Sequence, residues 1–142
     1  MREALGLARD GEAAGEVPVG AVIAIADDVV GRGWNAPVAR HDPTAHAEIV
    51  AIREAAASAR NYRLETATLY CTLEPCVMCA GAIVTARIAR LVFGARDLRF
   101  GGVRSKFRIA DSDVLNHQVE IVEGVLAAEC VELLREFFGG RR

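Results

Sequence analysis

Two short motifs constrain this chain more than any other feature, because together they supply the ligands of one metal site. His46-Ala47-Glu48 comes first, and Pro75-Cys76-Val77-Met78-Cys79 follows further along the chain. An imidazole and two thiolates suit zinc, and a three-ligand set leaves the fourth tetrahedral position open. An open site beside a free carboxylate predicts hydrolytic chemistry rather than a structural zinc staple.

The cysteine motif lies where a helix is expected to begin. Pro75 suits the first helical position, and Cys76 and Cys79 then point to one face of the helix. The partial positive charge of a helix N-terminus favours thiolate over thiol, and two thiolates neutralise a Zn²⁺ ion. A C-x-x-C pair alone is also typical of redox proteins, so this motif by itself leaves both interpretations open.

The histidine motif favours the metal site. His46 follows Asp42-Pro43-Thr44 and is therefore expected in the first turn of an alanine-rich helix, where a lone histidine is more often a core or capping residue. At a helix end His46 and Glu48 can point at the same metal, although in mid-helix such positions do not face each other. Glu48 is expected to stay free as a proton carrier beside a water whose pKa zinc lowers to about 7.

The remaining cysteines and histidines are expected to lie outside the site. Cys71 belongs to a β-prone run and Cys130 to the last helix, and both are interpreted as small core residues. His41 and His117 are interpreted as loop residues.

The order of the predicted elements indicates the class of fold. Helices are expected over residues 2–14, 45–59, 75–86 and 125–138, strands over 21–26, 29–34, 67–72, 90–94 and 119–122, and a long polar loop over 95–117. An antiparallel hairpin followed by strands joined through helical crossovers favours a three-layer α/β/α sandwich with a five-stranded mixed central sheet. Ile49, Ile52 and Ala56 are expected to form the buried face of the second helix.

The composition indicates one globular domain, residues 1–142. The chain is 52% hydrophobic and 25% charged. No apolar run approaches the roughly 20 residues of a membrane helix, and the first residues contain no apolar signal segment. We therefore expect a cytoplasmic protein without a membrane segment, whose four cysteines serve as metal ligands and core thiols rather than as disulfides.

The charge is unevenly distributed along the chain. The net charge of −2 excludes a strong overall attraction to nucleic acid. One stretch is nevertheless basic, with Asp97 as its only acid; its basic residues are Arg87, Arg90, Arg96, Arg99, Arg104, Lys106 and Arg108. Such a cluster can hold a phosphate backbone, and it is equally consistent with an ordinary solvated surface.

The two motifs resemble the signature of the zinc-dependent cytidine and deoxycytidylate deaminase superfamily, H-A-E followed by P-C-x-x-C. Within that superfamily the sequence is most similar to bacterial tRNA-specific adenosine deaminases. The likeness extends over nearly the whole chain, in segments 16–22, 33–35, 40–48, 61–64, 67–70, 72–82 and 92–97, with Asn116-His117 and Phe137-Phe138.

The resemblance implies a reaction and a set of site residues. The implied reaction is hydrolytic deamination of the wobble adenosine in a tRNA anticodon stem-loop to inosine, carried out by a homodimer. The implied residues are His46, Cys76 and Cys79 as ligands of one Zn²⁺ per subunit, Glu48 as the proton shuttle, Asn35 as a contact of the target nucleoside, Val19 in the base pocket, and Asp97 beside the RNA-binding loop.

One segment departs from the family pattern, and two other functions remain open. Residues 101–110 are more basic than the pattern expected of the family, which concerns how RNA is held rather than the chemistry. The zinc motif alone also fits a deaminase of a small substrate such as free cytidine or guanine. A non-catalytic zinc protein that binds RNA is the third possibility, and Glu48 argues against it.

Overall fold

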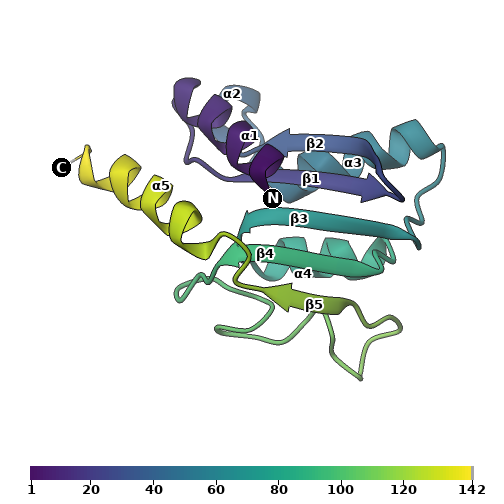
Figure 1. Ribbon diagram of the computed structural model, residues 1–142. Coiled ribbons are helices and arrows are strands. Elements are labelled where there is room, and N and C mark those ends of the chain that lie inside the picture. Colours follow the sequence, from purple (N-terminus) through teal and green to yellow (C-terminus); the bar gives the residue numbers. More distant parts are fainter. Residues whose placement is uncertain (142) are drawn as a thin grey trace.

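In the computed structural model, which describes residues 1–141, a five-stranded mixed sheet lies between two layers of helices (Figure 1). The strands are β1 (Gly20–Ile25), β2 (Asp28–Trp34), β3 (Ala67–Leu73), β4 (Arg90–Ala95) and β5 (Glu120–Glu123). The helices are α1 (Arg2–Ala13), α2 (Pro37–Arg40), α3 (Ala47–Ala59), α4 (Val77–Thr85) and α5 (Ala127–Gly139). The predicted α/β/α class is confirmed. The single domain 1–142 stays a prediction, and its last residue lies outside the described part.

The strand order β2-β1-β3-β4-β5 brings the termini of four strands together at the same end of the sheet. β1 pairs antiparallel with both β2 and β3, whereas β3, β4 and β5 run parallel, as the hairpin and the helical crossovers predict. The start of β1 therefore lies beside the ends of β2, β3 and β4, with Gly20 opposite Trp34 and Leu73 opposite Ala95. The residues next to these ends are thereby brought together, although they are far apart in the sequence.

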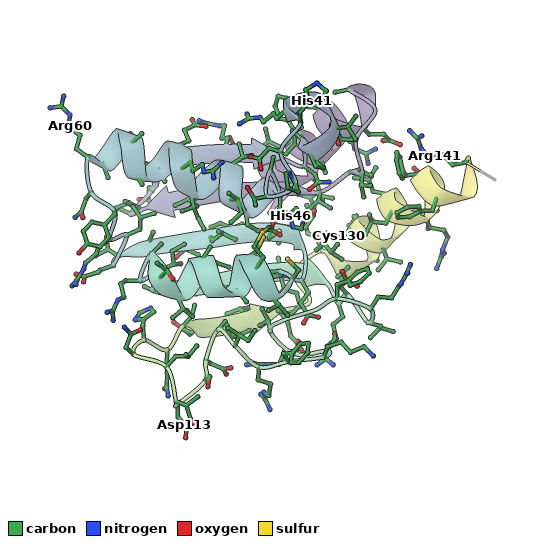
Figure 2. All side chains as sticks on the ribbon, turned by 180° about the vertical axis from the view of Figure 1, so that it is seen from behind. His41, His46, Arg60, Asp113, Cys130 and Arg141 are labelled. Atoms are coloured by element: carbon green, nitrogen blue, oxygen red, sulfur yellow. The ribbon has the colours of Figure 1, made fainter. Side chains whose placement is uncertain are left out.

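The helices divide between the two faces of the sheet. α1 and α5 cover the face seen in Figure 1, and α3 and α4 lie side by side on the opposite face, seen in Figure 2. One buried cluster includes Cys71 and Phe93 beneath α3 and α4, and another joins Leu5 of α1 to Cys130 of α5. Both cysteines interpreted as core residues are thus buried in the core.

The prediction for the buried face of α3 was wrong. Ile49, Ile52 and Ala56 are only partly buried, whereas Ala47, Glu48, Ala51 and Ala55 are buried. The reason is the close approach of α3 to β2. A Cβ atom at Gly31 or Gly33 would collide with the backbone carbonyls of α3, so the helix can turn only its small side chains toward this strand.

Two helices begin later than predicted. α3 starts at Ala47, so His46 is its N-cap residue with extended backbone angles rather than part of its first turn. α4 starts at Val77, so Pro75 lies before the helix and Cys76 is its N-cap. Pro75 is excluded from the helix because β3 pairing continues beyond Leu73: the Glu74 N–H donates to the Ala95 carbonyl at 2.8 Å.

One short element was not predicted. α2 is a single turn between β2 and α3 that ends at His41, a residue in the left-handed region with φ 50°. No helix within residues 1–141 has both the length and the apolarity needed to cross a bilayer.

Candidate active site

The three predicted zinc ligands meet at the adjacent N-termini of α3 and α4. His46 is the N-cap of α3, Cys76 is the N-cap of α4, and Cys79 lies in the first turn of α4. The Nδ1 atom of His46 is 3.5 Å from the sulfur of Cys76 and 3.5 Å from that of Cys79. All three donor atoms lie within 4.8 Å of one another.

This donor set fits a zinc ion. Zinc bonds to nitrogen at about 2.1 Å and to sulfur at about 2.3 Å, and a tetrahedral angle then places the two atoms about 3.6 Å apart. The observed separations of 3.5 Å match that value. Among residues 1–141, no fourth histidine, cysteine or acidic residue joins this group of ligand atoms. The residues present thus fit a zinc site with one open position.

The ligands favour ionised sulfur. The hydrogen bond from Cys79 lowers the pKa of Cys76 to about 4, against the opposing effect of burial, and contact with His46 lowers it further. The same hydrogen bond, together with burial, raises the pKa of Cys79. The hydrogen bond with Cys76 raises the pKa of His46. Cys76 is therefore a thiolate at neutral pH even without a metal ion.

Glu48 lies beside the ligands and is almost completely buried, with 4% of its surface exposed. Its Oε2 atom accepts a hydrogen bond from the thiol of Cys79 at 3.1 Å, and its Oε1 atom accepts one from Cys71 at 2.9 Å. Burial raises the pKa of Cys71 well above its usual range, so this thiol stays protonated and remains a donor. Cys71 is a core residue as predicted, and it also contacts the carboxylate.

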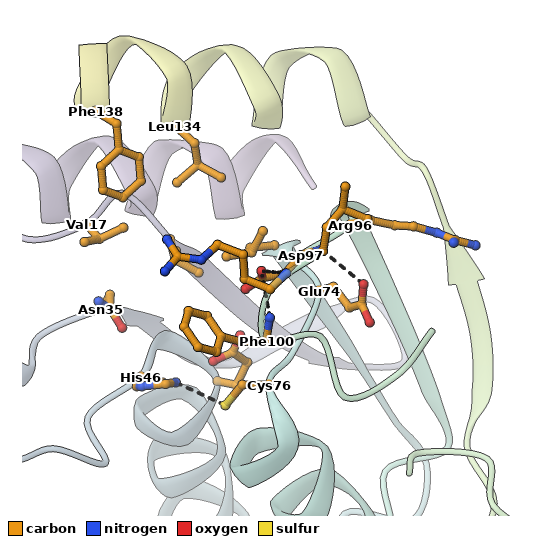
Figure 3. A pocket seen from close by; sticks show the side chains of 15 residues that line it. Val17, Asn35, His46, Glu74, Cys76, Arg96, Asp97, Phe100, Leu134 and Phe138 are labelled. Atoms are coloured by element: carbon orange, nitrogen blue, oxygen red, sulfur yellow. Dashed lines mark hydrogen bonds between the residues drawn. The ribbon is translucent and has the colours of Figure 1, made fainter. Parts of the chain in front are cut away.

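A cavity of about 740 Å³ opens onto His46, Glu48 and Cys76 (Figure 3). Val19, directly before β1, and Asn35, directly after β2, also line it. The cavity therefore connects the candidate metal ligands to two of the three residues expected to contact substrate.

Asp97, the third of these residues, also lines the cavity, directly after β4. Its Oδ1 atom accepts hydrogen bonds from the backbone N–H groups of Arg99 at 3.0 Å and Phe100 at 3.1 Å. The carboxylate thus closes a turn that begins the long loop. Asp97 thus lies at the start of this loop, and its expected place beside an RNA-binding loop stays a prediction.

Three of the seven basic residues of the stretch pair with acids that lie outside it. Arg90 pairs with Glu120 at 3.4 Å, Arg96 with Glu123 at 2.9 Å, and Arg104 with Asp111 at 3.1 Å.

Arg87 donates to the Asn116 carbonyl at 2.9 Å. Within residues 1–141, Arg99, Lys106 and Arg108 have no acidic partner within 4.0 Å. Together with Arg87, they are four basic residues of the stretch whose charge no acid neutralises within the described part of the chain.

Two parts of the site were not deduced from residue chemistry. Leu134 and Phe138 of α5 form the cavity wall opposite His46 (Figure 3). Glu74, which follows β3, is buried and also lines the cavity. In the sequence, Glu74 stands out only as a charged residue directly after an apolar strand. That position does not indicate which residues its side chain contacts.

The fold and the site define a class of protein: an α/β/α domain in which the starts of two helices present a histidine and two cysteines beside a buried glutamate. Residues 1–95 match the family model of the cytidine and deoxycytidylate deaminase zinc-binding region. The chain belongs to this deaminase family, whose zinc-binding region accounts for the ligand cluster.

Within this family, the chain is similar over nearly its full length to proteins named tRNA-specific adenosine deaminase. The chain is 53% identical to a tRNA-specific adenosine deaminase of Haemophilus influenzae, over 100% of this chain and 83% of that protein. It is 44% identical to the protein of the same name from Streptococcus pyogenes serotype M1, over 97% of this chain and 81% of that protein.

Solved structures of deaminases share the fold of this chain. A structure from work on A-to-I editing by tRNA:A34 deaminases at the wobble position has a TM-score of 0.91 and 42% identity, covering 94% of this chain and 97% of the other. A guanine deaminase from Nitrosomonas europaea has a TM-score of 0.84 at 26% identity, covering 97% of this chain and 82% of the other.

Proposed function

We propose that this protein is a zinc-dependent hydrolase that converts the wobble adenosine of a tRNA anticodon to inosine. The observation that carries this function is the 53% identity to a tRNA-specific adenosine deaminase over the full length of the chain. The 42% identity to the wobble-position deaminase structure agrees with it, whereas the guanine deaminase structure is only 26% identical. The substrate is accordingly the anticodon stem-loop of a tRNA.

His46, Cys76 and Cys79 are the residues proposed to hold one zinc ion per subunit. Their donor atoms have the separations that such an ion requires. When bound, zinc supplies a Lewis acid that makes water a nucleophile near neutral pH. The three residues would leave one coordination position open for that water. The cavity that opens onto His46 and Cys76 would give the substrate access to it.

Glu48 is the residue proposed to move protons. Its carboxylate takes a proton from the attacking water and delivers it to N1 of the adenine ring. The water oxygen bonds to C6. Glu48 then takes the remaining proton from that oxygen and delivers it to the amino nitrogen, the bond between C6 and this nitrogen breaks, and ammonia leaves a carbonyl at C6. Burial suits this role, because a carboxylate that is 4% exposed exchanges protons with substrate rather than with bulk water.

Asn35, Val19 and Asp97 are proposed to position the nucleoside. Asn35 carries an amide that can both donate and accept hydrogen bonds at the cavity wall. Val19 offers an apolar surface for the base, and Asp97 holds the turn at the start of the neighbouring loop. The anticodon loop suits this cavity, because its bases are already single-stranded and cost little to unstack.

Substrate choice is the direct test. The protein is expected to form inosine in an anticodon stem-loop that contains a wobble adenosine, and to leave free guanine, cytidine and adenosine unchanged at the same concentration. Sequencing the treated RNA detects inosine as an adenosine-to-guanosine change, and chromatography detects the free products. A stem-loop with guanosine at the wobble position is the matched control. Turnover of guanine or cytidine with inert RNA would instead favour a small-substrate deaminase.

We also propose that two copies associate through the partly apolar face of α3 and α4. The side chains that were expected to be buried on α3, Ile49, Ile52 and Ala56, remain partly exposed there. Together with Ala82 of α4 and Tyr62, which is 71% exposed, they line a shallow groove of about 360 Å³. Exposed apolar side chains gathered on two helices are typical of an interface between subunits.

Replacing Ile52 by aspartate is expected to convert the dimer to a monomer, because the charge would lose its water on association. Light scattering after size exclusion measures the mass in solution. Val114→Asp is the matched control, since Val114 is 86% exposed in the long loop and lies outside this groove. A wild-type protein that is monomeric at micromolar concentration would exclude the proposed dimer.

The cellular location follows from the proposed substrate. The structure contains no helix, within residues 1–141, that could cross a membrane. An enzyme that acts on tRNA is expected where tRNA is used, and we propose a cytoplasmic location on that ground.

A further inference from the structure

Glu74 is a buried carboxylate that the proposed reaction does not use. It follows directly after β3, two residues before the ligand Cys76, and 1% of its surface is exposed. A charged group that is so deeply buried must be compensated by hydrogen bonds or by an opposite charge. Its partners therefore indicate what it does.

The two oxygens of Glu74 accept five hydrogen bonds from a single loop. Oε1 accepts the backbone N–H of Asp97 at 3.1 Å and the hydroxyl of Ser105. Oε2 accepts the consecutive N–H groups of Val103, Arg104 and Ser105 at 3.2, 2.8 and 2.9 Å. Successive N–H groups that converge on one oxygen form an anion-binding nest.

The loop compensates the charge of Glu74 without a cation. Within residues 1–141, no side-chain nitrogen of a lysine, arginine or histidine lies within 4.0 Å of this carboxylate. The five N–H and O–H donors on its two oxygens take the place of a cation.

The backbone of the loop also lies directly against the segment that carries Cys76. Gly101 forms a β-bridge with Cys76, and the Gly102 N–H donates to the Pro75 carbonyl at 2.8 Å. A Cβ atom at Gly101 would collide with the carboxylate of Glu74. The loop therefore contacts each of the three consecutive residues from Glu74 to Cys76, which fixes its place relative to the ligand.

The side chains that this loop presents to the cavity are suited to nucleotides. Leu98 is 72% exposed and Phe100 is 60% exposed, and both line the cavity. The guanidinium of Arg99 lies 5.2 Å from the centre of the Phe100 ring. Exposed apolar and aromatic surface next to a cation is the combination on which single-stranded bases stack.

We propose that Glu74 is a positioning residue, which holds the substrate-facing segment 97–105 at a fixed place relative to the ligand Cys76. The segment would otherwise belong to a long loop without regular structure, and ordering it only on binding RNA would cost affinity. The inference rests on the proposed function, because it assigns the segment to an RNA substrate. If the inference holds, a change at Glu74 weakens binding of the stem-loop and leaves the rate of the chemical step unchanged.

The test compares Glu74→Gln with Glu120→Gln in the zinc-loaded protein. Glutamine keeps the shape of the side chain, but its NH₂ group replaces one acceptor and opposes the loop N–H groups. Glu120→Gln makes the same change of charge at an exposed residue paired with Arg90. The measurements are KM and kcat for the anticodon stem-loop, zinc content, and amide hydrogen exchange of residues 97–105.

Glu74→Gln is expected to raise KM about tenfold or more, with kcat within about threefold of the wild-type value and zinc content unchanged. Hydrogen exchange in segment 97–105 is expected to accelerate about tenfold, and Glu120→Gln is expected to change none of these quantities. Unchanged KM and exchange in Glu74→Gln would overturn the inference alone. Absence of inosine formation by the wild-type protein would overturn the proposed function, and the inference with it.

Two further variants cover the case in which Glu74→Gln does not fold. Ser105→Ala removes the hydroxyl donor to Oε1 and keeps the backbone hydrogen bonds. Gly101→Ala pushes the loop away from the carboxylate. Both are expected to raise KM several-fold with little effect on kcat. A fall in kcat with loss of zinc in these variants would place the role of Glu74 in the metal site and overturn the inference.

Discussion

Glu48→Gln is expected to abolish inosine formation while leaving the fold and the zinc content intact. A positioned acid and base contributes about 10² to 10⁴ in rate, and here one carboxylate serves both proton transfers. We therefore expect kcat to fall by at least about a thousandfold. Single-turnover assays with the anticodon stem-loop measure the rate, elemental analysis measures zinc, and circular dichroism reports the fold.

The matched control for Glu48→Gln is Glu132→Gln. Glu132 lies on α5 with 55% of its side chain exposed and pairs with Arg135 on the surface. The control removes the same charge and should retain full activity. Turnover of Glu48→Gln within tenfold of the wild type would show that protons move by another route, and the proposed role of Glu48 would be wrong.

Cys76→Ser is expected to lose zinc and to unfold at a lower temperature. A serine hydroxyl does not ionise near neutral pH, whereas the pKa of Cys76 is lowered to about 4. Because the metal binds the folded state, its loss removes binding free energy from the stability of the protein. We expect the melting temperature to fall by roughly 10 °C or more, as measured by calorimetry.

Cys130→Ser separates loss of zinc from loss of a buried thiol. Cys130 is 2% exposed and lies in the cluster between α1 and α5, remote from the ligands. This control should lose some stability and keep one zinc per subunit. Treating the wild type with a chelator should lower its melting temperature to about that of Cys76→Ser. Full zinc occupancy in Cys76→Ser would remove Cys76 from the proposed ligand set.

Local patterns predicted the strands well and the helix boundaries less well. The alternation of elements gave the five strands and the layer architecture, because burial period and turn residues act over short stretches. The start of α4 was misplaced, since pairing between Glu74 and Ala95 keeps the chain extended past Pro75. The buried face of α3 was also wrong, because two glycines of β2 admit only small side chains.

The sequence by itself determined the chemistry of this protein. The identities of His46, Cys76 and Cys79 restrict the metal, and the carboxylate of Glu48 in the same motif is the proposed proton carrier. These properties belong to the residue types and to their spacing along the chain. The meeting of these residues at one site depends in addition on the adjacent N-termini of α3 and α4.

Only the tertiary structure decided what surrounds that chemistry. It placed acids of β5 against Arg90 and Arg96, which the sequence showed in a basic stretch with Asp97 as its only acid. It brought α5 over the cavity and set the amides of segment 97–105 on the buried carboxylate of Glu74. Such contacts join residues far apart in the chain, so their energies depend on the three-dimensional packing and leave no local pattern in the sequence.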